Sequence, residues 1–319
     1  MNNEFFDVEV RSVRRESSSV VSLRLEHPLG QELPDWEAGA HVDVLLPNGL
    51  LRQYSLCSET RDRSSWRLGV LREPEGRGGS AYVHDELKPG TKVQVRGPRN
   101  NFALEPAGRY VFIAGGIGIT PVLPMVREAS RLGAPWRLVY LGRSRESMAF
   151  LGEVRALGGD VHIHADDESG LFPLADLLGG LEPGTCVYAC GPGPLLNVLQ
   201  SLAGGWADPS RLHLERFTAI GTAPEPADGT DTGFVVELTD GTEVPVGPDE
   251  SILQALEAAG INQPNSCREG ICGTCETGVL GGDGIDHRDS LLSDDEREAG
   301  DTMMICVSRC KGKRLLLDL

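Results

Sequence analysis

Four cysteines near the carboxyl-terminal end of this chain have the spacing of iron–sulfur ligands. Cys267, Cys272 and Cys275 follow the pattern C-x4-C-x2-C, and Cys306 comes after a gap of thirty residues. This is the ligand spacing of a plant-type [2Fe–2S] centre, in which four thiolates hold two irons. Structural zinc sites usually bring two C-x2–4-C pairs. The pattern therefore predicts a two-iron cluster, with zinc as the alternative.

Two glycines lie inside this cysteine loop. Gly270 and Gly273 stand where a loop that turns its N–H groups toward sulfur needs positive φ angles and no Cβ, which glycine permits. The other cysteines follow no pairing pattern, as in a reducing compartment. They are Cys57, Cys186, Cys190 and Cys310.

Two stretches near the amino-terminal end offer groups for a phosphorylated ring cofactor. Arg52-Gln53-Tyr54-Ser55 ends a predicted strand and supplies a guanidinium for a phosphate, an aromatic ring for stacking and a hydroxyl. Arg77-Gly78-Gly79-Ser80 precedes a predicted helix over 81–87, with Ser80 as its N-cap, and such an exposed helix start favours a phosphate. Each stretch alone is typical of ordinary surface, and only the two together favour phosphate binding.

A glycine loop follows a continuous apolar run in the middle of the chain. Residues 115–121 separate a predicted strand over 109–114 from a predicted helix over 122–132, with Thr120 suited to cap the helix and Pro121 to its first position. The loop reads G-x-G-x-x-P and not G-x-G-x-x-G, so it is a weak dinucleotide signal by itself.

Further glycines and acids follow other predicted strands. Residues 190–194, which begin with Cys190-Gly191-Pro192, come after a strand over 186–189, and two glycine-bearing strand ends suit a nucleotide. Asp166-Asp167 follow a strand over 161–164 and suit either a ribose hydroxyl or ordinary loop charge. Cys190 could equally be a small buried apolar residue.

The elements that must position these residues change in type along the chain. Residues 5–95 show six short alternating runs with a hairpin signal at Asn48-Gly49, which predict a small antiparallel β-barrel. Strands then alternate with helical runs over 149–157 and 194–203, which predicts an α/β domain with a parallel sheet.

The last part of the chain has a different pattern. A hairpin around Asp240-Gly241 precedes a helix that starts at residues 248–250 and ends at Gly260, and a final strand pair is expected over 303–307 and 314–317. Cys306 would lie inside the first of these strands and Cys310 in the turn after it. The expected fold is a compact half-barrel of mixed type.

These patterns divide the chain into three domains, over 1–105, 106–221 and 232–319, with a linker over 222–231. The net charge is −17, and residues 232–319 hold 7 Lys/Arg against 17 Asp/Glu. That balance argues against nucleic acid and anionic membranes as partners. It suits docking on a basic protein surface, with simple solubility as the alternative. The amino terminus has no signal pattern, so a cytoplasmic location is expected. No sustained heptad is visible, so a monomer is expected.

Taken together, the motifs resemble those of the phthalate dioxygenase reductase family, which includes vanillate O-demethylase reductases. The resemblance covers essentially the whole chain. It is carried, in this order, by residues 52–55, 77–80, 115–121, 190–192, Glu215-Arg216-Phe217 and the four cysteines.

The resemblance implies FMN in the barrel and NADH on the parallel sheet. It places Arg52 and the loop 77–80 on the flavin phosphate, Tyr54 along the ring, Ser55 near its reactive edge, and the main chain of Val70 and Leu71 against it. The full set of cofactor-binding residues expected on this basis is Arg52, Gln53, Tyr54, Ser55, Val70, Leu71, Arg77, Gly78, Gly79, Ser80, Gly116, Gly118, Thr120, Pro121, Asp167, Cys190, Gly191, Pro192 and Phe217.

Ser55, Cys190 and Phe217 are expected near the nicotinamide and the flavin, as catalytic residues, and the β-grasp ferredoxin domain is expected to hold the cluster. NADH is favoured, although Arg143-Ser144-Arg145 leaves NADPH open. Because a hydride carries two electrons and the cluster accepts one at a time, a flavin must stand between them.

The implied function is the reductase component of a two-component Rieske non-haem iron oxygenase, of the aromatic O-demethylase or ring-hydroxylating type. The same electron relay serving a cytochrome P450 is one alternative. A redox-sensing iron–sulfur binding module is an alternative of another class, although a sensor needs no nicotinamide site.

Overall fold

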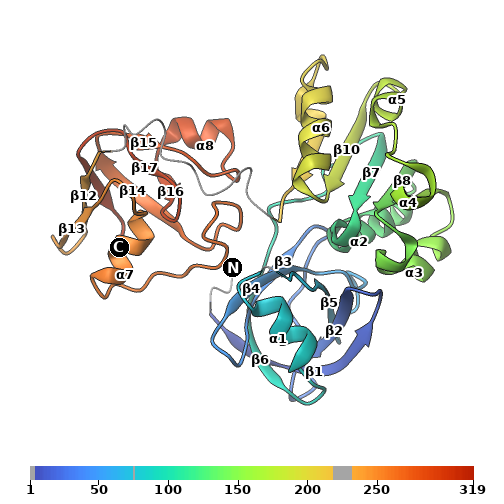
Figure 1. Ribbon diagram of the computed structural model, residues 1–319, viewed down its shortest axis with the longest axis horizontal. Coiled ribbons are helices and arrows are strands. Elements are labelled where there is room, and N and C mark those ends of the chain that lie inside the picture. The colour runs from blue at the N-terminus through green and yellow to red at the C-terminus, as the bar shows by residue number, and fades with distance from the viewer. Residues whose placement is uncertain (1–3, 75, 218–231) are drawn as a thin grey trace. The chain divides into compact units, whose positions relative to one another are not determined.

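The computed structural model describes residues 4–74, 76–217 and 232–319 (Figure 1). The chain forms two compact units, Met1–Arg216 and Phe217–Leu319. The predicted linker over 222–231 lies outside the described residues. Among the residues described, no helix is both long and apolar enough to cross a lipid bilayer.

The first unit begins with an antiparallel barrel, as predicted. Its six strands run in the order β4-β3-β6-β1-β2-β5, and a bridge between Leu56 and Leu68 joins the two edges. Gly49, with φ +82°, turns the chain from β3 into β4. Apolar side chains from the strands fill the interior. The elements are β1 (Phe6–Arg15), β2 (Val20–Glu26), β3 (His41–Leu45), β4 (Leu51–Ser55), β5 (Trp66–Leu71), α1 (Gly79–Asp85) and β6 (Lys92–Arg99).

A five-stranded parallel sheet follows, also as predicted, in the order β11-β10-β7-β8-β9. Its strands are β7 (Arg109–Gly115), β8 (Trp136–Gly142), β9 (Asp160–Ala165), β10 (Thr185–Cys190) and β11 (Leu212–Glu215). The helical elements are η1 (Gly116–Gly118), α2 (Ile119–Arg131), η2 (Arg145–Ser147), α3 (Leu151–Ala156), α4 (Asp166–Ser169), α5 (Leu174–Gly179), α6 (Gly193–Ala203) and η3 (Pro209–Arg211). Sequence patterns had not indicated β11 or α5, because both are short.

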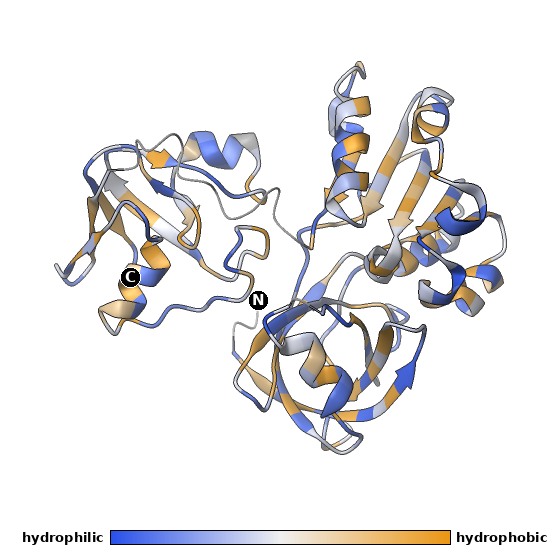
Figure 2. Ribbon diagram, in the orientation of Figure 1, coloured by the Kyte–Doolittle hydropathy of each residue, from blue (hydrophilic) through white to orange (hydrophobic). Residues whose placement is uncertain are grey.

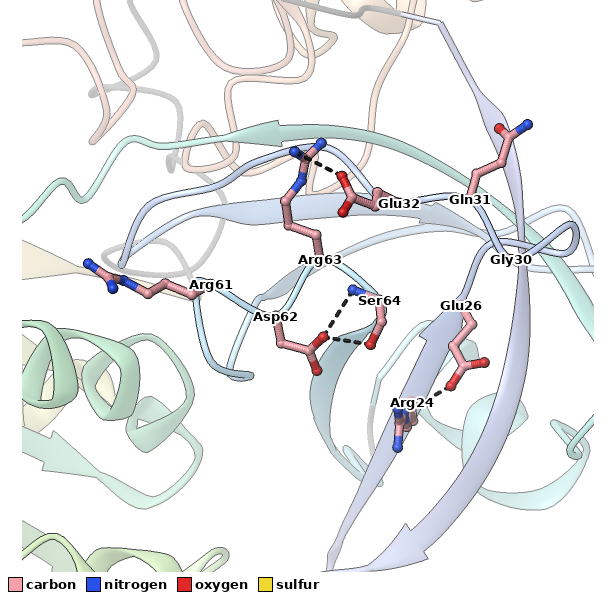
Figure 3. A pocket seen from close by; sticks show the side chains of 9 residues that line it. All are labelled: Arg24, Glu26, Gly30, Gln31, Glu32, Arg61, Asp62, Arg63 and Ser64. Atoms are coloured by element: carbon pink, nitrogen blue, oxygen red, sulfur yellow. Dashed lines mark hydrogen bonds and ion pairs between the residues drawn. The ribbon is translucent and has the colours of Figure 1, made fainter.

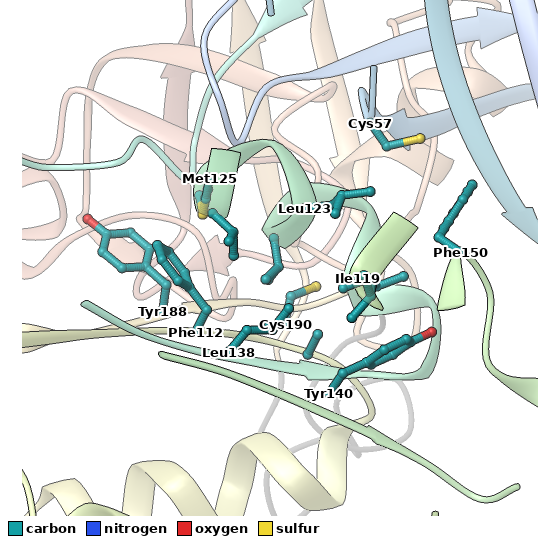
Figure 4. Packing of buried hydrophobic residues seen from close by; sticks show 14 of the residues in the cluster. Cys57, Phe112, Ile119, Leu123, Met125, Leu138, Tyr140, Phe150, Tyr188 and Cys190 are labelled. Carbon is teal, nitrogen blue, oxygen red and sulfur yellow. The ribbon is translucent and has the colours of Figure 1, made fainter. Parts of the chain in front are cut away.

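Separate apolar clusters cover the two faces of this sheet. One cluster packs α2 against β7, β8 and β10, and Figure 4 labels some of its members, among them Ile119 and Leu123 of α2 and Phe112 and Cys190 of the sheet. The other cluster includes Leu178 of α5 and Leu196 and Leu199 of α6. Hydrophobic residues accordingly concentrate in the strands and on one face of α6 in Figure 2. In sheets of this kind, ligands bind outside the carboxyl ends of the strands.

The second unit has a mixed five-stranded sheet in the order β13-β12-β18-β14-β16, in which only β12 and β18 pair in parallel. The elements are β12 (Phe234–Leu238), β13 (Glu243–Val246), α7 (Ile252–Ala258), β14 (Glu276–Gly282), β15 (Ile285–Asp286), α8 (Asp294–Ala299), β16 (Thr302–Met304), β17 (Arg309–Cys310) and β18 (Arg314–Leu317). The predicted hairpin at Asp240-Gly241 is confirmed.

The predicted final strand pair is wrong. β16 and β18 do not pair with each other, because β14 lies between them and pairs with both. β14 contains three glycines and was not recognised in the sequence. The helix predicted from residue 248 begins at Ile252, where Ser251 forms a capping box with Gln254.

Two helix starts also differ from prediction. α1 begins at Gly79 with Gly78 as its N-cap, and Ser80 lies inside the helix, where its Oγ accepts a hydrogen bond from the Glu73 N–H at 3.0 Å. Thr120 does not cap α2, because the 3-10 turn η1 leads directly into the helix at Ile119. A glycine is the N-cap of each helix, Gly78 in α1 and Gly118 in α2, so neither helix has a side-chain cap.

Candidate redox cofactor sites

The barrel brings Arg52 and the loop before α1 together. One Arg52 guanidinium nitrogen donates to the Arg77 carbonyl oxygen at 2.8 Å, and a Cβ on Gly79 would come within 2.3 Å of Arg52 Nε. Burial and the neighbouring Arg77 charge lower the pKa of Arg52. Two guanidinium groups close enough to repel each other form a place where an anion is stabilising. These residues fit the phosphate of a flavin nucleotide.

The residues of β4 alternate between two faces. In the pairing of β3 with β4, Tyr54 is opposite Val42 and packs against the barrel core, while Gln53 is opposite Asp43 and donates to Asp43 Oδ1 at 3.4 Å. Burial raises the pKa of Tyr54 to about 12, so its hydroxyl stays protonated. The structure therefore brings Arg52 and Tyr54 to one face and places the Gln53 side chain on the other.

Ser55 ends β4, directly opposite His41. Ser55 Oγ and His41 Nε2 are both buried, and neither has a hydrogen-bond partner in the part of the chain that the structure describes. An unpaired buried polar atom costs about 1–3 kcal/mol. Such atoms fit the edge of a bound ring that can pair with them. Sequence reasoning missed His41, because only the strand register reveals it.

The two glycine loops of the parallel sheet pack on each other at the ends of β7 and β10. A Cβ on Gly118 would lie 2.1 Å from the Cys190 carbonyl oxygen, and one on Gly191 would lie 3.0 Å from Gly115 Cα. Gly116 has φ +54° and no atom within 4 Å of the position of a Cβ. The loops thus meet closely and leave open space over Gly116, as a pyrophosphate requires. Thr120 Oγ1 donates to the Ile117 carbonyl at 2.9 Å.

Cys190 ends β10 beside Glu215, which ends β11. The two side chains share a hydrogen bond. Burial raises the pKa of Glu215 to about 8, and the hydrogen bond from Cys190 lowers it by a smaller amount. Burial likewise raises the pKa of the Cys190 thiol. Both shifts favour the neutral form of the side chain. Glu215 had been noticed only as part of a motif, since nothing in the sequence signals its burial.

Two further residues of the expected set stand apart. Asp167 is exposed in α4, and its N–H donates to the Arg143 carbonyl oxygen at 3.0 Å, which joins the ends of β9 and β8. Phe217 is the first residue of the second unit and is 40% exposed.

The second unit gathers all four predicted cluster ligands. Cys267 is in hydrogen-bonding contact with both Cys272 and Cys306, and Cys306 with Cys275. All but Cys267 are buried. The Glu269 N–H donates to Cys267 Sγ at 3.3 Å. The thiols therefore share one site.

The backbone of the cysteine loop has the conformation expected for cluster binding. Gly270 has φ +70° and Gly273 has φ +71°. Arg268, which directly follows Cys267, also has a positive φ, of +59°. A Cβ on Gly270 would lie 2.6 Å from Val307 Cγ2. Glycine is required there by both the backbone angle and the close approach.

The positions of two cysteines were predicted wrongly. Cys306 lies in the turn after β16, where the Val307 and Ser308 N–H groups both donate to the Met304 carbonyl. Cys310 lies in β17, which pairs with β15. β16 ends at Met304, so the turn that follows it, and not a strand, carries Cys306.

Comparison with known proteins supports a flavin-binding domain and a [2Fe–2S] domain. A family model described as a 2Fe–2S iron–sulfur cluster binding domain matches residues 236–311. Another, described as an oxidoreductase FAD-binding domain, matches residues 7–104. A protein of Ectopseudomonas oleovorans named phenoxybenzoate dioxygenase subunit beta is 43% identical over 315 residues, which are 98% of this chain and 97% of that protein.

The solved structures extend this likeness over the whole chain. A structure of phthalate dioxygenase reductase, described as modular for electron transfer from pyridine nucleotides to [2Fe–2S], is 38% identical with a TM-score of 0.72, and the match covers 99% of this chain and 98% of that one. The chain belongs to the phthalate dioxygenase reductase family. It is thus an electron-transfer oxidoreductase with a flavin-binding domain and a [2Fe–2S] domain.

An intact type IV self-sufficient cytochrome P450 monooxygenase shows the same arrangement of elements inside a longer chain. It is 43% identical with a TM-score of 0.89, and this reductase-family chain spans 41% of its length. The family fold therefore also occurs joined to a P450.

Family membership also decides between iron–sulfur and zinc at the four thiols. The family model that matches residues 236–311 is described as a 2Fe–2S iron–sulfur cluster binding domain, which favours a two-iron centre over zinc.

One surface hollow of the barrel is lined by residues outside the candidate cofactor sites. It has a volume of about 520 Å³ and is lined by residues of the barrel, among them Arg24, Glu32, Arg61 and Asp62 (Figure 3). Arg63 pairs with Glu32 at 3.0 Å, and Asp62 accepts hydrogen bonds from Ser64. Its mixed, self-paired charges indicate ordinary polar surface.

Proposed function

We propose that this protein is the reductase component of a two-component Rieske non-haem iron oxygenase, of the aromatic O-demethylase or ring-hydroxylating type. It takes electrons from NADH by way of FMN and the cluster and delivers them singly to the oxygenase. One observation carries the proposal. A cluster of four thiols and two loops suited to bind phosphate, the loop before α1 and the glycine loop after β7, lie in one chain. That chain matches proteins of oxygenase systems over nearly its full length.

The proposal divides the chain into an FMN domain (1–105), an NAD domain (106–221), a linker (222–231) and a ferredoxin domain (232–319). The cluster ligands are Cys267, Cys272, Cys275 and Cys306. A monomer in solution is part of the proposal and is checked by light scattering.

In this assignment Arg52 and Arg77 bind the flavin phosphate, since their charges adjoin. FMN ends in a single phosphate group, which is the group that this loop would bind. Ser55 Oγ and His41 Nε2 pair with the ring edge, and Tyr54 lies along the ring. Chromatography of the flavin released by heat distinguishes FMN from FAD.

The nucleotide side is assigned to the glycine loops. Gly116 and Gly118 allow the pyrophosphate to approach the main chain, and the Gly191-Pro192 turn forms the opposite side. The neutral Cys190 and Glu215 side chains place no fixed charge beside the nicotinamide, and Phe217 would cover it. When bound, the flavin and the cluster supply the conversion of a two-electron hydride into single electrons.

The test is an anaerobic NADH titration of the purified protein, followed by flavin absorbance and by electron paramagnetic resonance. We expect about one equivalent of NADH to bleach the flavin and to produce a reduced-cluster signal. Cys272→Ser should abolish the signal and keep NADH-dependent flavin bleaching. Cys310→Ser is the matched control and should keep both.

The outcome that contradicts the proposal is a protein that binds iron while NADH leaves flavin and cluster oxidised. A redox-sensing module would then be favoured, because a sensor needs no turnover. NADH-driven reduction of an artificial acceptor would dismiss the sensor.

The second candidate is the same relay serving a cytochrome P450, which the likeness to the self-sufficient P450 chain favours. The two candidates differ only in the acceptor. Adding purified Rieske oxygenase or purified P450 to the NADH-reduced protein, and measuring how fast the cluster is reoxidised, decides between them.

A further inference from the structure

The ends of β8 and β9 bear on the choice between NADH and NADPH, which differ by one phosphate on the adenosine ribose. In parallel sheets that bind dinucleotides, the ligand lies outside the carboxyl ends of the strands. An acidic residue there pairs with the ribose 2′-hydroxyl, whereas an arginine accommodates a 2′-phosphate. In this chain the strand that follows α2 is β8, and Arg143-Ser144-Arg145 come directly after it.

The turns after β8 and β9 are joined to each other. β9 is the parallel neighbour of β8, with Gly142 opposite Ala165. The Asp167 N–H donates to the Arg143 carbonyl oxygen at 3.0 Å. The acidic turn of α4 is therefore held against the basic turn of η2.

One of the two arginines is already occupied. Arg145 Nε lies 2.8 Å from Glu168 Oε1 and 3.0 Å from Glu168 Oε2. The base of its side chain is held by a capping box, in which Ser144 Oγ accepts from the Ser147 N–H and Ser147 Oγ from the Ser144 N–H. Arg145 thus starts from a fixed backbone position and is directed to Glu168.

The other arginine provides a contrast. Arg143 is exposed, and no ion pair or side-chain hydrogen bond of its guanidinium is found in the described part of the chain. It has the same charge as Arg145, lies two residues away and is not held by Glu168. It is the matched control for any effect of charge alone.

We propose that Glu168, by holding Arg145 and adding a negative charge beside Asp167, makes this protein selective for NADH. Removing the Glu168 charge turns Arg145 into a ligand for the 2′-phosphate of NADPH. The inference rests on the proposed function, since it concerns the coenzyme of that reaction. Asp167 pairs with the 2′-hydroxyl in NADH, whereas a phosphate with a charge of about −1.5 to −2 is repelled by both acids.

The experiment compares kcat/KM for NADH and NADPH, with a neutral quinone as acceptor. For Glu168→Gln we expect kcat/KM with NADPH to rise about five- to tenfold, because one repulsion is lost and one guanidinium is freed. With NADH the value should stay within about twofold, because the ribose hydroxyl carries no charge.

Double variants identify the group responsible. Arg145→Ala in the Glu168→Gln background should remove most of the gain with NADPH. Arg143→Ala in the same background should keep most of it. Glu168→Asp, which keeps the charge, should behave like the unaltered protein.

Three results would overturn the inference. One is an unaltered protein that already uses both coenzymes equally. Another is an NADPH value that does not change in Glu168→Gln, and the third is a gain that survives the loss of Arg145. If no variant reacts with either coenzyme, the proposed function itself has failed, which is a different outcome from lost selectivity.

Discussion

At the scale of single residues, the unpaired Ser55 hydroxyl makes a prediction with opposite signs for two states of the protein. Without flavin, Ser55→Ala should raise the free energy of unfolding by between zero and about 1 kcal/mol, because the change removes a buried hydroxyl that lacks a partner. With flavin bound, the same change should weaken flavin affinity and slow flavin reduction by NADH about tenfold.

The measurements are unfolding of the flavin-free protein and stopped-flow bleaching of the loaded one. Ser58→Ala serves as a control, since Ser58 Oγ already accepts from the Arg67 N–H at 3.2 Å. It should destabilise both states. A Ser55 variant that loses stability equally in both states would show that the hydroxyl serves the fold alone.

Glu215 makes a prediction about pH. Burial raises the pKa of Glu215 in the folded protein to about 8, above the ordinary value of 4.5. The folded state therefore keeps a proton that the unfolded state releases at a lower pH. The stability linked to Glu215 is fully present below pH 4.5 and is lost progressively as pH rises to about 8.

Glu215→Gln cannot ionise, so the variant should lose less of its thermal stability than the unaltered protein between about pH 5.5 and pH 8.5. Melting temperatures measured across that range check the difference. Identical slopes in the two proteins would mean that Glu215 does not hold a proton in the folded state.

At the scale of elements, an ion cluster connects the barrel to the parallel sheet within the first unit. Arg67 of β5 binds both carboxylate oxygens of Glu153 in α3, at 2.5 and 2.8 Å, and its guanidinium carbon lies 4.8 Å from the centre of the Phe150 ring. Arg127 of α2 reaches Glu153 at 2.6 Å. Phe150 itself has a positive φ of +57°, which is rare for a bulky residue and persists only under firm packing.

Glu153→Gln should destabilise the protein by about 1–2 kcal/mol, because two partly buried arginines lose their shared carboxylate. This expected cost is lower than for a fully buried pair, because solvent reaches Glu153 and screens the interaction. Asp85→Asn breaks the exposed pair of Asp85 with Arg72 and should leave the free energy of unfolding nearly unchanged, because solvent screens that pair. Urea unfolding of both variants checks the difference, and equal costs would contradict a connecting role for the cluster.

At the scale of the whole molecule, the ferredoxin region has a larger excess of acidic over basic residues than the rest of the chain. Residues 232–319 hold 7 Lys/Arg against 17 Asp/Glu, and α8 is strongly hydrophilic in Figure 2. Opposite charges speed the encounter of two proteins, and salt screens them. We expect the rate of electron delivery to the oxygenase to fall about tenfold between about 0.05 and 0.5 M NaCl.

Reduction of a neutral quinone by the same protein should change little over that range, because no charged surface has to meet the acceptor. Stopped-flow oxidation of the reduced cluster measures the first rate. A salt dependence of the same size with quinone would point to an effect inside the reductase and not to docking.

Much of the site was readable from sequence because its signals are local. The C-x4-C-x2-C spacing, the positive φ at Gly270 and Gly273, and the hairpins at Asn48-Gly49 and Asp240-Gly241 depend on a few neighbouring residues. The six barrel strands and the alternation of strand and helix are likewise visible in short windows. Helix starts were less predictable, because Gly78 and the turn η1 replaced the expected Ser80 and Thr120 caps.

The sequence by itself determined which residues could ligate a cluster or approach a phosphate, since residue type and spacing set that chemistry. Only the tertiary structure decided which of them meet. In the structure, β14 lies between β16 and β18, and Cys306 lies in a turn and not in a strand. His41 is buried opposite Ser55, and Arg145 pairs with Glu168. The physical reason is that these contacts join residues far apart in the chain, and strand pairing and packing across the fold decide them.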